Sequence, residues 1–140
     1  EGVYQTTRAG SHVRHMVDHF IALQQGIASG TIDYNRRNRD SVIESDINEG
    51  LQAIENIINA LGKMTTQDRK VSVISEIDCH QTLSEHFDST VRRELLYLIN
   101  HTIHHTAYMK LLVKPCGVEL PDEIGIAPGT ATFLRNTQTA

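Results

Sequence analysis

Three histidines stand within five positions of an otherwise apolar stretch, LLYLINHTIHHTAYMKLL, as His101, His104 and His105. His101 and His105 are four residues apart, so one turn of a helix brings their side chains to the same face. Two neutral imidazoles at that spacing can bind one divalent metal ion. His104 is expected to lie on another side of the helix, away from the pair.

The pair belongs to a series of positions spaced alternately four and three residues apart, which is typical of a helix face that packs against other helices. The series consists of Glu94, Leu98, His101, His105, Tyr108 and Leu112. An imidazole nitrogen left without a partner in a dry interior costs about 1–3 kcal/mol, and a bound metal removes that cost. The alternative is a plain helical core whose histidines are satisfied by hydrogen bonds. Glu94 is a candidate catalytic proton carrier, or else a solvated carboxylate at the end of this face.

A third metal ligand is available from the segment SHVRHMVDHF, which carries His12, His15 and His19 at spacings of three and four. These histidines form a stripe beside the apolar positions of the same segment, and periodicity alone does not choose among them. His80 and His86 lie in polar surroundings without periodicity and are predicted to be solvated.

The spacing of apolar residues predicts three helices, over about residues 10–29, 46–62 and 91–114. In the second helix, the packed face is predicted at positions spaced alternately four and three residues apart, namely Ile47, Leu51, Ile54, Ile58 and Leu61. The three helices together predict an all-α fold.

Two segments outside the helices are less regular. Residues 69–79 alternate apolar and polar side chains, which fits either a short strand or an extended crossing segment. The tail after residue 116 is rich in Pro and Gly, and it is predicted to be irregular or to contain one short helical turn. Ile124, Ile126 and Phe133 are expected to pack it against the rest of the chain.

Composition excludes several classes of protein. The 140 residues suit one domain, 1–140, with a core of its own, and 39% hydrophobic and 21% charged residues fit neither a disordered nor a membrane chain. A net charge of −4 without a dominant basic cluster argues against nucleic acid as a partner. Cys79 and Cys116 form no C-x-x-C pattern and are read as reduced, which favours a cytoplasmic protein.

Two motifs resemble those of the DinB-like, or YfiT-like, family. RAGSHVRHMVDHF is similar to a motif in which a Gly-containing turn enters a helix with one His, two apolar residues and an acid, matched here by His15 to Asp18. NHTIHHTAYMKLL is similar to a last-helix motif with His-x-x-x-His after an Asn, matched by His101 and His105. STVRRELLYLINH and ELPDEIGIAPGT resemble one subgroup of the family. The resemblance implies that His15, His101 and His105 are the metal ligands.

The resemblance also implies a fold, a four-helix bundle around a divalent metal, with zinc or nickel most expected. Only three such helices are visible here, so the family's first helix is expected to be missing or truncated before residues 1–9. The chain begins with Glu instead of Met, in keeping with that expectation.

The function implied is a metal-dependent enzyme acting on a small molecule, either as a hydrolase or as a thiol S-transferase that uses a low-molecular-weight thiol. The alternative is a non-catalytic metal-binding or stress-associated interaction protein. A homodimer is a further expectation that the sequence leaves open.

Overall fold

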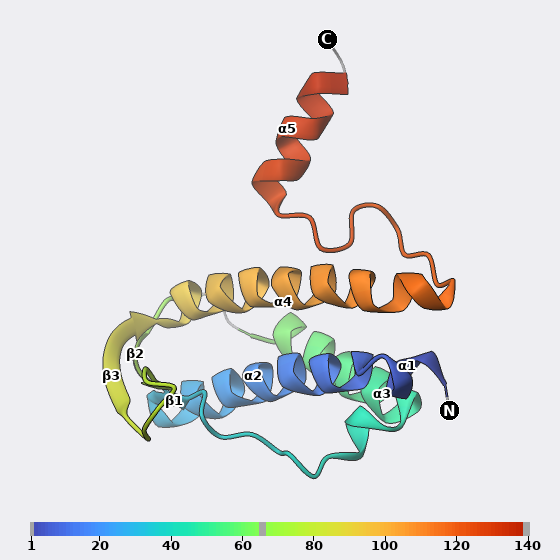
Figure 1. Ribbon diagram of the computed structural model, residues 1–140. Coiled ribbons are helices and arrows are strands. Elements are labelled where there is room, and N and C mark those ends of the chain that lie inside the picture. Colours follow the sequence, from blue (N-terminus) through green and yellow to red (C-terminus); the bar gives the residue numbers. More distant parts are fainter. Residues whose placement is uncertain (1, 65–66, 139–140) are drawn as a thin grey trace.

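The computed structural model of the protein describes residues 2–64 and 67–138 (Figure 1). Two long helices, α2 (Ala9–Ser29) and α4 (Val91–Val113), lie side by side, and a small sheet lies at one end of the pair. The other elements are α1 (Val3–Thr6), β1 (Thr31–Asp33), the 3₁₀ helix η1 (Val42–Glu44), α3 (Ile47–Gly62), β2 (Lys70–Glu76), β3 (Ser84–Thr90), the 3₁₀ helix η2 (Lys114–Cys116) and α5 (Pro128–Gln138).

The sheet shows that the all-α four-helix bundle predicted from the sequence is wrong, because the chain has an α/β fold. Its strand order is β1–β2–β3. β1 runs parallel to β2, with Ile32 beside Val73, and β3 runs antiparallel to β2, with Phe87 beside Val73. Parallel strands need a long crossover, and α3 lies in the connection between β1 and β2. The alternation over residues 69–79 was therefore the pattern of a strand.

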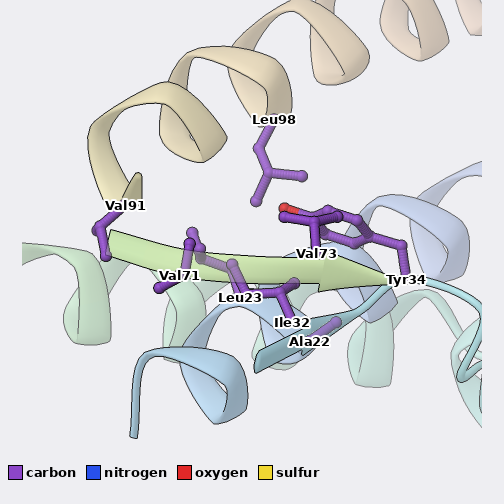
Figure 2. Packing of buried hydrophobic residues seen from close by; sticks show 8 residues of the cluster. All are labelled: Ala22, Leu23, Ile32, Tyr34, Val71, Val73, Val91 and Leu98. Carbon is purple, nitrogen blue, oxygen red and sulfur yellow. The ribbon is translucent and has the colours of Figure 1, made fainter. Parts of the chain in front are cut away.

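The larger hydrophobic cluster lies between the sheet, α2 and the first turns of α4 (Figure 2). Val71 and Val73 are two residues apart on β2, so their side chains share one face of the strand and enter this cluster. Leu23, Ile32 and Leu98 are its most deeply buried apolar side chains, each at most 1% exposed. A second, smaller cluster around Val13, Val17 and Ile57 joins α2 to α3.

The ends of α2 and α4 follow from local chemistry. α2 ends at Gly30, which takes a positive φ of 82° and donates its N–H to the carbonyl of Gly26 at 2.8 Å. α4 begins after Thr90, whose hydroxyl accepts a hydrogen bond from the N–H of Arg93 at 3.3 Å. Both helices confirm predictions made from periodicity.

α3 confirms the remaining predicted helix, but it packs through a different face from the one predicted. Ile47, Leu51 and Ile58 are 52%, 55% and 61% exposed. The side facing α2 carries Gly50, Ala53 and Ile57, and of the predicted positions Leu61 packs there. α3 is apolar on two faces, and the lack of a side chain at Gly50 lets the Tyr4 hydroxyl approach on the inner one.

α5 stands away from the rest of the chain (Figure 1). The tail was predicted to hold at most one short turn, but α5 is a helix of 11 residues. Phe133 is 65% exposed, so it does not pack as predicted, and Ile124 is 36% exposed. Pro128 begins the helix, a position where the missing N–H of Pro has no intrahelical partner to lose.

Cys79 and Cys116 are both free and exposed, in agreement with the prediction that they are reduced. Among the helices in residues 2–64 and 67–138, none combines the length and the apolar character needed to cross a membrane.

Candidate metal centre

His15 from α2 meets His101 and His105 from α4 where the two helices lie side by side. The ring centroids are 4.9 Å apart for His15 and His101, 4.6 Å for His15 and His105, and 4.5 Å for His101 and His105. Each ring offers one nitrogen that lies within 4.8 Å of a nitrogen of the other two. This three-histidine group is an arrangement that could hold a metal ion.

The two hydrophobic clusters position the group. Along α2, His15 lies between Val13 and Val17 of the smaller cluster and is followed by Leu23 of the larger one. Along α4, His101 follows the fully buried Leu98. The three histidines therefore lie between two apolar regions, where each is half-buried.

This burial acts on the protonation of the three rings. It lowers the pKa of His15 to about 3 and the pKa of His101 and of His105 to about 4, since the charged imidazolium loses hydration there. Repulsion among the neighbouring histidines lowers these pKa values further. All three rings are therefore neutral at pH 7, which is the form that binds a metal.

Two further histidines of α2 surround the group. His19, only 5% exposed, lies with its ring centroid 4.4 Å from that of His15 and 4.4 Å from that of His101. Its Nδ1 lies 2.9 Å from the carbonyl oxygen of His15 and must donate, because a carbonyl only accepts. His12 Nδ1 lies 2.8 Å from His105 Nδ1, so one of these rings donates to the other. Such contacts fix the orientation of rings that bind metals.

His104 is exposed and lies to the side, as the helix geometry predicted. His80 and His86 are exposed as well, in agreement with their predicted solvation. His19 is a buried neighbour of the group that the sequence did not separate from His12 and His15, because the three histidines of this helix share the same spacing. Its burial between the two helices distinguishes it in the structure.

A cavity of about 420 Å³ opens beside the group, lined by His15, His19 and His101. Tyr34 and Tyr97 form part of its wall, together with Arg37 and residues 75–79, which span the end of β2 and the loop after it. No local pattern marked these residues, because the strand end, the loops and the helix that carry them come together only in the folded chain.

Glu94, the candidate proton carrier, lies in a different environment. It is 1% exposed and accepts hydrogen bonds from the Tyr34 hydroxyl and from an Arg93 guanidinium nitrogen, both at 2.9 Å, and from Ser89. It lines a second cavity of about 370 Å³, which shares Tyr34 and Tyr97 with the first. These hydrogen bonds link Ser89 of β3 and Tyr34, the residue after β1, to α4, and so they stabilise the fold. A catalytic role for Glu94 stays a prediction.

Comparisons with known proteins place the chain in no family. No family model matches it, and no solved structure matches it. A curated protein, FK506-binding protein 5 of Rhizopus delemar, is 28% identical over 125 residues, which cover 84% of this chain and 32% of that protein. The chain thus spans about a third of the length of this curated relative.

Proposed function

We propose that the protein binds a divalent metal ion, zinc or nickel, through His15, His101 and His105. One observation carries the proposal: three neutral rings from two helices each present a nitrogen within 4.8 Å of the other two. Imidazole is a suitable ligand for both metals. The likeness of the histidine motifs to those of DinB-like proteins supports the same three ligands.

We further propose that the site serves an enzyme acting on a small molecule, as a hydrolase or as a thiol S-transferase. Three protein ligands leave one position of a tetrahedral ion open, which is typical of catalytic zinc. A divalent ion bound there supplies Lewis-acid chemistry. The adjoining cavity of about 420 Å³ falls within the usual size range of small-molecule sites. The alternative is a non-catalytic metal-binding or stress-associated interaction protein.

Metal binding is tested by elemental analysis of protein purified without a histidine tag, after dialysis against zinc or nickel. We expect about one equivalent of metal in the wild type and less than about a tenth in His101→Ala. His104→Ala is the matched control, because it removes an exposed histidine from the same helix, and it should bind like the wild type. A wild type that takes up no metal would refute the site.

Catalysis is tested by screening the metal-loaded protein against ester and amide substrates and against electrophiles offered with low-molecular-weight thiols. Turnover that is present in the wild type and in His104→Ala, and absent in His101→Ala, supports the enzyme. Full metal binding without turnover on either class of substrate favours the non-catalytic alternative.

A further inference from the structure

Arg37 lies in the wall of the cavity beside the three-histidine group, although it belongs to the irregular segment between β1 and η1. In the part of the chain that the structure describes, no carboxylate forms an ion pair with its guanidinium. Arg36, the preceding residue, differs because it pairs with Asp33 at 3.2 Å. Arg37 is exposed, so its guanidinium is accessible to a partner outside the chain, although its charge also acts on the buried Asp18 carboxylate.

The charge of Arg37 acts on the three-histidine group across the cavity that they share. Its proximity helps to lower the pKa of His15, His101 and His105, after burial and the neighbouring histidines. Among the described residues that line the cavity, Arg37 is the only permanent cation. Two carboxylates, Glu76 and Asp78, line the cavity too. Glu76 is exposed to solvent. Asp78 accepts hydrogen bonds within its own loop, from the His80 N–H at 2.7 Å and from the Gln81 side chain at 3.0 Å.

We propose that Arg37 anchors an anionic oxygen group, a carboxylate or a phosphate, of the small molecule that reaches the three-histidine group. The inference rests on the proposed function. A guanidinium presents two parallel N–H donors that fit such a group. The substrate class is thus a small organic anion.

Cobalt(II) is a suitable probe, because its visible absorption responds to a ligand that enters its coordination sphere. The cobalt-loaded wild type, Arg37→Gln and Arg36→Gln are titrated with acetate, with methylphosphonate and with neutral imidazole. We expect Arg37→Gln to lower the affinity for one or both anions by about tenfold or more. Imidazole affinity should stay within about twofold, and Arg36→Gln should resemble the wild type.

The two anions separate a carboxylate-bearing from a phosphate-bearing substrate. Equal anion affinity in Arg37→Gln and the wild type overturns the role of Arg37 while leaving the metal site intact. Failure of the wild type to take up cobalt overturns the proposed function, and the anchor with it.

Discussion

The Nε2 atoms of His15 and His101 lie 2.9 Å apart across the contact of α2 with α4, although 86 residues separate them in the chain. In a tetrahedral zinc site, Zn–N distances of about 2.0–2.1 Å place two ligand nitrogens about 3.3 Å apart. The rings therefore need only a small separation to admit an ion. The folded chain presents these ligands together, whereas the unfolded chain does not.

We expect zinc to raise the melting temperature, since an ion that binds only the folded state stabilises it. At a free zinc concentration about 100-fold above Kd, the gain is about 2.7 kcal/mol. For a domain of this size the shift is roughly 10 °C. Calorimetry with zinc and with a chelator measures it. His104→Ala should shift like the wild type, and an equal shift in His101→Ala would contradict the ligand set.

The metal-free protein should lose stability as the pH falls from about 6.5 to about 4. The folded-state pKa values of His15, His101 and His105, about 3 to 4, lie below the ordinary value of 6.5. Between these limits the unfolded chain binds more protons, so the free energy of unfolding rises with pH across this window. It should be nearly constant above pH 7. Urea unfolding at pH 7, 5 and 4 measures the slope.

The control for the pH dependence is a variant with all three histidines changed to Gln, which should have a flatter profile over the same window. His104→Gln should keep the wild-type slope, because His104 is exposed. An unchanged slope in the triple variant would show that other groups cause the acid sensitivity.

Glu94→Gln should destabilise the fold by about 1–3 kcal/mol, because an amide nitrogen would face hydroxyl and guanidinium donors in a buried site. The wild-type carboxylate is 1% exposed and accepts from Tyr34, Ser89 and Arg93. Chemical denaturation measures the loss, and the exposed Glu85→Gln serves as the control. Lost turnover at unchanged stability would instead favour the proton-carrier role.

Gly26→Ala should destabilise the protein by about 1–3 kcal/mol through overpacking between α2 and β1. A Cβ at Gly26 would lie 2.3 Å from Ile32 Cγ1 and 2.7 Å from Ile32 Cα, and a backbone atom cannot move aside cheaply. Gly129→Ala is the matched control, since no atom lies within 4 Å of the added Cβ. Equal melting temperatures for the two variants would contradict the close approach.

The long helices and the histidine pair were predictable because their signals are local. His101 and His105 are one turn apart on α4, and that spacing alone puts them on one face. The choice of His15 came from the family resemblance, since periodicity did not separate it from His12 and His19. The structure brings His15 to the pair, and its role as a metal ligand stays a prediction.

The sheet and the cavity wall were not predictable in this way. β1 has three residues, and β3 reads SEHFDST, so neither shows a clear alternation of apolar and polar side chains. On α3, the spacing of Ile47, Leu51, Ile54 and Ile58 is that of a buried face, although these side chains are exposed. The side with the small Gly50 is the one that packs. Arg37 shares the cavity wall with the histidines only because the folded chain brings their segments together.

The distance in sequence between His15 and His101 has a consequence for folding kinetics. The segment that separates them contains the parallel pairing of β1 with β2, the crossover through α3 and the β2–β3 hairpin. Contacts that close so long a loop form late, because the chain loses conformational entropy before the contacts contribute their favourable free energy. We therefore expect the three-histidine group to assemble after the sheet, so that the rate of metal capture during refolding reports a late step of folding.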